Sequence, residues 1–182
     1  MMRLISMIWR RIIKQFRFLL KKIDRDFGYG WLKIWERCSI EARQAFYSAE
    51  REAEELGHNF ITPEHLLLGL IVSDNLGADI LRLMGINLEV IYQKIKEAIL
   101  QNKIIVKQKQ QMYLTPQGKR VIELACIEAD ELNDDYIGTE HLLLAILQEK
   151  GIITQIFNEW GVELEDIRRI IRELRKGDWN ND

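Results

Sequence analysis

Apolar residues recur at intervals of three and four along most of the chain, which is the spacing of helices that bury one face. The pattern predicts four helices between residues 39 and 100. The first opens at Ser39 and stops at Gly57, the second is capped by Thr62, the third spans Ala78–Met84, and the fourth is capped by Asn87. Only two prolines interrupt the 182 residues, so we expect an all-α chain.

The pattern is duplicated. The phrase Glu-His-Leu-Leu-Leu occupies residues 64–68 and returns at residues 140–144, 76 positions later. At this offset, residues 39–100 and 115–176 share 18 identical residues in 62 pairs, far more than the roughly one in sixteen that chance would give. Such self-similarity marks a repeated structural unit. We therefore expect two pseudo-symmetric four-helix repeats, joined by a linker over residues 101–114, in one domain of residues 38–176 followed by a polar tail over residues 177–182.

The chain begins with a segment of a different kind. Residues 3–25 predict an amphipathic helix whose apolar stripe includes Ile5, Ile8, Trp9, Ile12 and Phe16 and whose cationic side includes Arg10, Lys14, Arg17 and Lys21. This combination is typical of a helix that lies in a membrane interface. Two alternatives stay open: the stripe packs on the body or on a partner, or residues 1–25 are an organellar targeting segment. An aromatic linker completes this region to residue 37, and we expect a short helix or turn there.

Charge separates the same two regions. Residues 1–37 hold ten Lys and Arg against three acids, whereas residues 38–182 hold 16 against 25, which together give the net charge of −2. A basic arm on an acidic body indicates two different tasks, and the acidic body argues against nucleic-acid binding. Cys38 and Cys126 lack the spacing of a disulfide scaffold, which favours a reducing compartment such as the cytoplasm.

The sequence offers no catalytic constellation. Glu64-His65 and Glu140-His141 lack the second histidine or cysteine that metal sites need at short spacing. There is no nucleophile motif, Gly-rich phosphate loop or Walker motif. We therefore predict no metal, no cofactor and no enzymatic activity. The simplest interpretation makes the leucines core, the histidines caps of a loop, and the glutamates partners of a helix dipole.

A binding role for the glutamates is the alternative. Ser39 and Thr115 hold equivalent positions at the N-terminus of the first helix of each repeat. A helix N-terminus with a hydroxyl attracts an anion, and a carboxylate attracts a guanidinium. Ser39 with Glu64, and Thr115 with Glu140, would then hold a ligand that is anionic at one end and cationic at the other.

The duplicated segments resemble the N-terminal domain of the Clp ATPases, and of ClpC in particular. The resemblance covers about residues 38–176 and is carried by residues 56–70 (LGHNFITPEHLLLGL), residues 136–144 (YIGTEHLLL) and residues 114–124 (LTPQGKRVIEL). It implies a compact eight-helix domain that binds substrates and adaptors of the Clp machine. In ClpC-like members it also implies recognition of phosphorylated arginine, here by Ser39 with Glu64 and by Thr115 with Glu140. Departures from the family pattern are Ser39 for Thr, Asp134 for His and Gly118 for Ala.

These observations predict a stand-alone Clp N-domain protein without ATPase modules. The leading hypothesis is a non-enzymatic accessory or adaptor protein whose partners are Clp ATPase and protease subunits, adaptors or substrates. The alternatives are a phosphoarginine-binding sensor or decoy, and a membrane-surface scaffold independent of Clp. The predicted location is the cytoplasm, with residues 1–25 at a membrane surface, or an organelle if those residues are a targeting segment.

Overall fold

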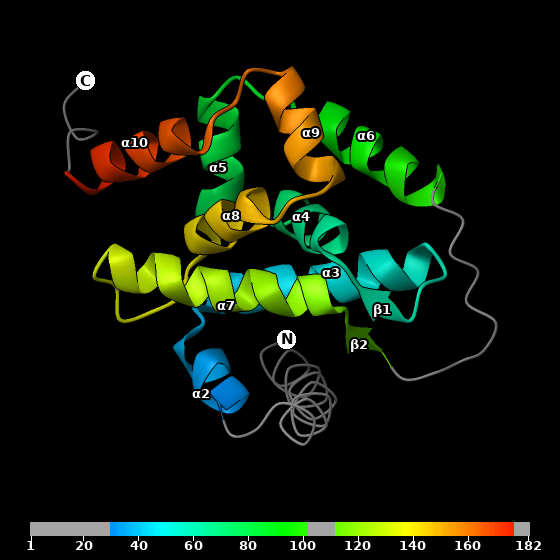
Figure 1. The fold of residues 1–182 in the computed structure, drawn as a ribbon, viewed down its shortest axis with the longest axis horizontal. Helices are drawn as coiled ribbons and strands as arrows, with labels where there is room; N and C mark the ends of the chain where they lie inside the picture. Colours follow the sequence, from blue (N-terminus) through cyan, green and yellow to red (C-terminus); the bar gives the residue numbers. More distant parts are fainter. Residues whose placement is uncertain (1–29, 102–111, 177–182) are drawn as a thin grey trace, which may run out of the picture. The chain divides into compact units, whose positions relative to one another are not determined.

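The computed structural model describes residues 30–101 and 112–176 (Figure 1). The predicted amphipathic helix over residues 3–25 and the tail over residues 177–182 lie outside the described residues. The chain divides into two compact units, residues 1–37 and residues 38–182. In the first unit, the described residues form the helix α2 (Gly30–Arg37).

The second unit contains the predicted repeats. Its described residues form eight helices in two sets of four: α3 (Ile40–Glu55), α4 (Pro63–Ile71), α5 (Leu76–Leu83) and α6 (Leu88–Gln101), then α7 (Pro116–Glu131), α8 (Thr139–Gln148), α9 (Ile152–Glu159) and α10 (Leu164–Arg175). The all-α fold of two four-helix repeats is thereby confirmed. One predicted boundary is wrong: α5 begins at Leu76 rather than Ala78, because Asn75 caps it by accepting a hydrogen bond from the Ala78 amide (3.0 Å).

Two very short strands were not predicted. Strand β1 (Phe60–Ile61) pairs in parallel with β2 (Tyr113–Leu114), and Cys38 forms a matching bridge with Ile137. A strand of two residues carries no periodic pattern, so the sequence gives no signal for it. Of the two residues of β2, Leu114 is buried and Tyr113 is exposed.

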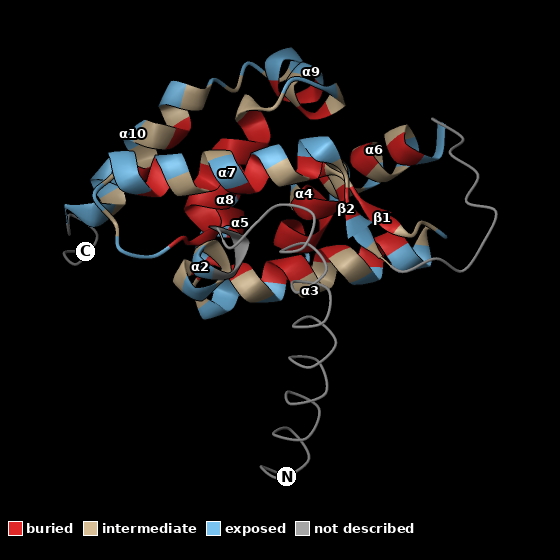
Figure 2. Ribbon diagram, turned by 60° about the horizontal axis from the view of Figure 1, so that its bottom comes forward, coloured by how far each residue is buried: buried red, intermediate tan, exposed pale blue. Residues whose placement is uncertain are grey.

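Helices α4 and α8 lie at the centre of the second unit, between the α3 and α7 pair and the remaining four helices (Figure 1). They are buried along most of their length, as Figure 2 shows. The two leucine triplets are part of this core, since residues 66–68 and 142–144 are at most 4% exposed. The predicted core role of the repeated leucines is confirmed. Their burial removes six large apolar side chains from water, at about 1.5–3 kcal/mol each.

Each repeat also buries one glutamate at an equivalent position. Glu52 accepts a hydrogen bond from the Tyr92 hydroxyl (2.7 Å), and Glu128 is paired with Arg168 (2.7 Å). Both donors come from the fourth helix of the repeat, α6 or α10. Burial, followed by the bond to Glu52, raises the pKa of Tyr92 to about 12. A buried carboxylate must be satisfied by such a donor, so this pair ties the first helix of each repeat to the fourth.

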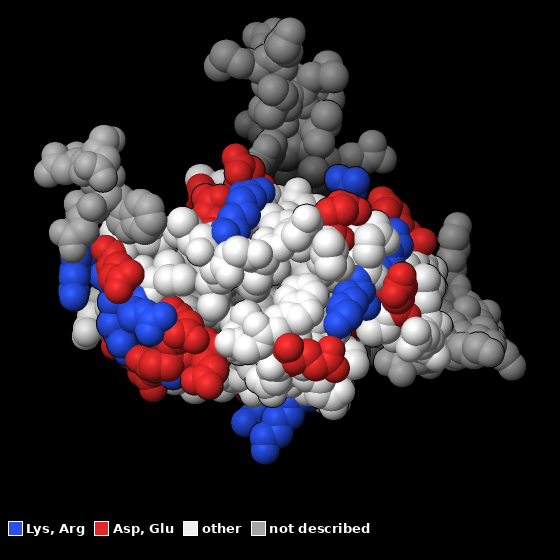
Figure 3. All heavy atoms as spheres, turned by 90° about the horizontal axis from the view of Figure 1, so that it is seen from above, with Lys and Arg blue, Asp and Glu red and all other residues white. Residues whose placement is uncertain are grey.

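Charged side chains of both signs are mixed over the region of α10 (Figure 3). Arg169 pairs there with Asp166 (2.7 Å) and Arg172 with Glu165 (2.9 Å). Within the described residues, no helix combines the length and apolar character needed to cross a membrane.

Candidate functional site

The start of the second repeat is tied to the first repeat. The Thr115 amide donates to the Ile61 carbonyl (3.0 Å), and the Thr115 hydroxyl donates to the same oxygen (3.2 Å) while it accepts from the Gly118 amide (3.1 Å). Thr115 therefore caps α7, as predicted. It also lies at the junction of β1 and α4, which belongs to the other repeat.

The start of the first repeat is tied to the second in the same way. The Ser39 amide donates to the Ile137 carbonyl (2.9 Å), and the Ser39 hydroxyl accepts from the Ala42 amide (3.1 Å). Ser39 thus lies beside the segment that leads into Glu140. Each capping residue is consequently attached to the loop that leads into the glutamate of the other repeat, whereas the predicted pairs lie within one repeat. The parallel bridges explain this exchange, because each one joins a helix start to the loop of the opposite repeat.

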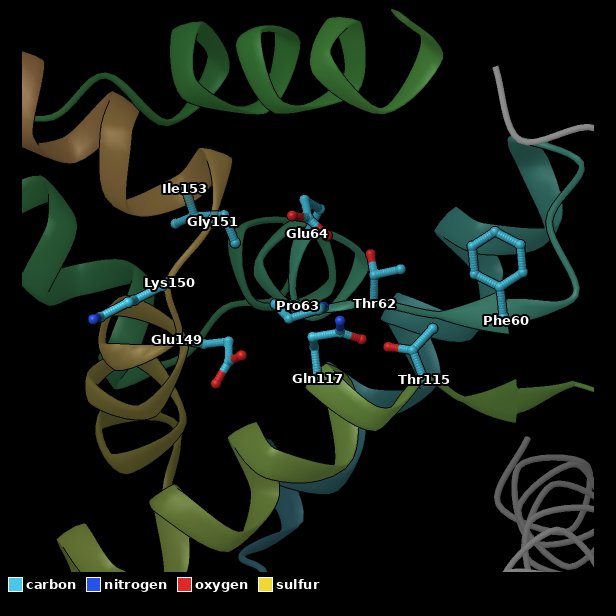
Figure 4. Close-up of a pocket in the computed structure, with 10 residues that line it drawn as sticks. All are labelled: Phe60, Thr62, Pro63, Glu64, Thr115, Gln117, Glu149, Lys150, Gly151 and Ile153. Atoms are coloured by element: carbon cyan, nitrogen blue, oxygen red, sulfur yellow. The ribbon is translucent and has the colours of Figure 1, made fainter. Parts of the chain in front are cut away.

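A cavity of about 330 Å³ lies at the first of these crossings. It is lined by Phe60, Thr62, Pro63, Glu64, Thr115, Gln117, Glu149, Lys150, Gly151 and Ile153 (Figure 4). The lining residues come from β1, from the first turns of α4 and α7, from the loop between α8 and α9, and from the start of α9. Its size lies at the lower end of the range for small-ligand pockets. Glu64 and Thr115 share this cavity, whereas Ser39 and Glu140 do not line it.

Glu64 supplies a carboxylate that has no partner among residues 30–101 and 112–176. Within the described part of the chain it makes no hydrogen bond or ion pair, and it is partly exposed. The second carboxylate of the cavity, Glu149, is paired with Arg120 (3.3 Å). The Lys150 side chain points away from the cavity in Figure 4. The Glu64 carboxylate thus faces a space that is also bordered by the N-terminus of α7, which suits a ligand with both a cationic and an anionic end.

His65 holds the turn that presents Glu64. Its Nδ1 accepts from the Thr62 amide (3.1 Å), so a proton on the neutral ring belongs on Nε2, which lies 3.1 Å from His58 Nδ1. Burial, assisted by the neighbouring His58, lowers the pKa of His65 to about 4. The ring is therefore neutral at neutral pH and acts as a cap, in agreement with the interpretation from sequence.

The second copy of the phrase has a different environment. His141 Nδ1 accepts from the Gly138 amide (2.9 Å), and its Nε2 lies 2.9 Å from Asp134, which replaces His58 at the equivalent position. Burial lowers the pKa of His141, and the negative charges of Glu140 and Asp134 oppose this effect. Glu140 is only 3% exposed, and Arg175 lies beside it.

Asp134, Glu140 and His141 bring three atoms of metal-ligand type within 4.8 Å of one another. The Arg175 guanidinium, paired with Asp134, already supplies a positive charge to this group. A metal ion would have to compete with it, so the prediction that neither Glu-His pair forms a metal site remains the simpler interpretation.

Gln117, Glu149 and Arg175 are among the residues of these sites that were missed from the sequence. Gln117 and Glu149 have no repeat partner that draws attention to them, and only the fold brings them to the cavity. The sequence could have drawn attention to Arg175, because this charged residue aligns with the apolar Ile99 when the two repeats are aligned. The predicted membrane-helix residues, Ile5 to Lys21, lie outside the described residues.

Comparison with known proteins gives these features a family context. A model of the Clp repeat (R) N-terminal domain matches residues 37–160. The chain is 34% identical over 143 residues to the negative regulator of genetic competence ClpC/MecB of Bacillus subtilis, with coverage of 78% of this chain and 17% of the relative. It is 37% identical over 142 residues to the chloroplastic chaperone protein ClpC1 of Arabidopsis thaliana, with coverage of 76% and 15%. The chain thus spans less than a fifth of the length of these relatives.

Solved structures share the fold. The N-terminal domain of Hsp104 from Candida albicans matches with a TM-score of 0.64 at 20% identity, over 76% of this chain and 91% of that chain. A complex of the ClpV N-domain with a VipB peptide matches with a TM-score of 0.55 at 20% identity, over 74% and 84%.

Proposed function

Because the chain belongs to the Clp repeat N-terminal domain family, we propose that it is a non-enzymatic accessory protein of a Clp chaperone–protease. In this proposal residues 38–176 bind substrates, adaptors or the Clp ring. The observation that carries it is the cavity between the repeats, in which Glu64 is left unpaired beside Thr115. The ClpV N-domain, which shares the fold, has been solved with a VipB peptide, and this supports peptide binding as the kind of task such a domain performs.

A pull-down with the full chain tests this role. The chain is immobilised and offered the Clp ATPase, the protease core and adaptor proteins, singly and together. Retention of any of these components is expected. If none is retained under conditions in which the chain is folded, the accessory role is wrong.

The unpaired carboxylate favours a specific ligand class for the cavity. We propose phosphorylated arginine, with the guanidinium at Glu64 and the phosphate toward Thr115 and the N-terminus of α7. A charge-assisted hydrogen bond contributes about 1.5–3 kcal/mol, which corresponds to roughly a tenfold to hundredfold change in affinity. Glu64 and Thr115 line the same cavity, which supports Thr115 rather than Ser39 as the residue on the phosphate side.

Isothermal titration calorimetry with free phosphoarginine tests this ligand. The Glu64→Gln variant is expected to weaken binding at least tenfold, because the amide keeps the shape of the carboxylate and loses its charge. Glu97→Gln, at an exposed position of α6, is the matched control and is expected to bind like the wild type. Absence of heat with the wild type, or equal affinity of Glu64→Gln, contradicts the proposed ligand.

The basic segment gives the accessory role a location. We propose that residues 1–25 hold the chain at an anionic membrane surface, as the sequence pattern of an apolar and a cationic face indicates. Flotation with anionic liposomes at low salt compares the full chain with a variant that lacks these residues. Failure of the full chain to float assigns the segment to packing or targeting instead.

A further inference from the structure

The Glu140 copy of the motif already contains a cation. Arg175, the last residue of α10, places its guanidinium at a corner formed by the end of α7 and the start of α8. It is paired with the Asp134 carboxylate, donates to the Leu132 carbonyl (3.3 Å), and lies 3.8 Å from a carboxylate oxygen of Glu140. The Arg175 side chain is 32% exposed, whereas that of Glu140 is 4% exposed. An arginine of the chain therefore covers the glutamate that corresponds to the unpaired Glu64.

A glycine directs Glu140 inward. A Cβ atom on Gly138 would overlap the Glu140 carboxylate, at 2.7 Å from its Cδ. The carboxylate thus occupies the space that any other residue would fill at this position. In the first repeat the equivalent residue is Thr62, whose hydroxyl bonds to His65 (2.9 Å). The Thr62 side chain takes the space into which a glutamate would fold, and Glu64 lines the cavity instead.

The first repeat has no cation at the position equivalent to Arg175. Ile99 stands at the position equivalent to Arg175 and is buried in the core. Among the described residues the two copies therefore differ in a consistent way: the first has a carboxylate without an ion pair and an isoleucine at the position of Arg175, and the second has a buried carboxylate and an arginine. Both keep the same attachment of the capping residue, because the Ser39 amide donates to the Ile137 carbonyl as the Thr115 amide donates to that of Ile61.

We propose that the second copy is a guanidinium-binding site that the chain's own Arg175 occupies, so that an external ligand reaches only the cavity at Glu64. This inference rests on the proposed function for the ligand class of the first copy. Asp134 determines which class of ligand the second copy can bind. It is a carboxylate where the first repeat has a histidine, and it would repel a phosphate. An emptied second site therefore takes an unphosphorylated guanidinium and rejects phosphoarginine.

Chemical rescue of a truncated Arg175 tests the inference. Thermal unfolding of the full chain is followed at pH 7.5 for the wild type, Arg175→Ala, and Arg175→Ala combined with Glu140→Gln. Arg175→Ala is expected to lower the Tm, because Asp134 and Glu140 lose their shared cation. Millimolar ethylguanidinium is expected to raise the Tm of Arg175→Ala by at least about 2 °C, since it refills the site.

Matched controls make the result specific. Ethylammonium has the same charge without the planar fork and is expected to produce no rescue. The wild type and the double variant are expected not to respond to ethylguanidinium. Lack of rescue in Arg175→Ala, or an equal rise in all three proteins, overturns the inference.

Two further measurements separate this inference from the proposed ligand. If Arg175→Ala does not fold, the wild type is studied instead by nitrogen NMR of its arginine side chains. Slow rotation of the Arg175 guanidinium is expected, and free rotation overturns the inference. In one outcome, the wild type binds no phosphoarginine while ethylguanidinium still rescues Arg175→Ala. That combination contradicts the proposed ligand of the first copy and supports the inference that Arg175 fills the second copy.

Discussion

The two repeated histidines perform one structural task in two electrostatic settings. His65 and His141 each accept a hydrogen bond from the amide three residues earlier, at Thr62 and Gly138. This acceptor role requires an unprotonated Nδ1. The pKa of both rings is lowered by burial, but His141 lies beside Asp134 and Glu140, which favour its charged form. Acid is consequently expected to destabilise the protein through His65, whose charged form is opposed by burial and by His58.

The pH dependence of stability tests this cap. The unfolded chain protonates His65 below about pH 6.5, whereas the folded chain does so only near pH 4. The free energy of unfolding therefore falls as the pH is lowered between these values, because the unfolded state binds the extra proton. Between pH 7.5 and 4.5 this one residue accounts for about 2–3 kcal/mol.

The variant His65→Gln isolates that contribution. Glutamine at the third position of a helix accepts the cap amide and does not titrate. Urea unfolding at several pH values is expected to show a smaller loss of stability in acid for His65→Gln than for the wild type. Parallel curves for the two proteins would assign the acid sensitivity to other groups.

At the scale of elements, equivalent helices of the two repeats pack at different distances. Gly69 of α4 lies against the backbone of α3, and a Cβ there would be 2.8 Å from Ala49 Cα. The equivalent residue of α8 is Ala145, which is fully buried with its methyl group. Helices α3 and α4 therefore approach more closely than their counterparts can, and the small alanines of α3 permit this contact.

Gly69→Ala is expected to destabilise the protein. In an ordinary helix this change raises stability by about 1 kcal/mol. Here the added methyl group would overlap the backbone of α3, and overpacking of a core costs about 1–3 kcal/mol. Calorimetry or circular dichroism is expected to show a lower Tm. A higher Tm would mean that α3 and α4 separate without cost.

The helices and their duplication were predictable because both leave a pattern that spans many residues. The spacing of apolar residues located all eight helices of the domain, and Ser39 and Thr115 were correctly identified as caps. The crossed attachment of the repeats was not predictable, since it depends on strands of two residues and on the bridge at Cys38. The pairing of Glu64 with Thr115 follows from that attachment, which explains why the sequence suggested Ser39 instead.

At the scale of the whole domain, the repeats form one body rather than two. Helix α4 packs on α8, and the Gly77 amide donates to the Thr139 hydroxyl (3.0 Å) across the repeat boundary. Lys94 of α6 pairs with Glu159 of α9 (3.1 Å). A unit of about 60 residues buries too little surface to be reliably stable by itself. The cavity at Glu64 needs both repeats as well, because its walls come from α4, α7 and the loop after α8.

Cleavage between the repeats tests this shared core. A protease site is inserted between residues 107 and 108, and the folded protein is cut and compared with the uncut form. The two pieces are expected to co-elute in gel filtration and to unfold in one transition, because the contacts between repeats remain. Their Tm is expected to be lower than that of the uncut chain, since the cut frees the two ends in the unfolded state.

Each piece purified alone is expected to lose most of its helical circular dichroism signal. Pieces that separate under native conditions, each with native helicity, would show that the repeats are independent and that the cavity between them forms only by docking.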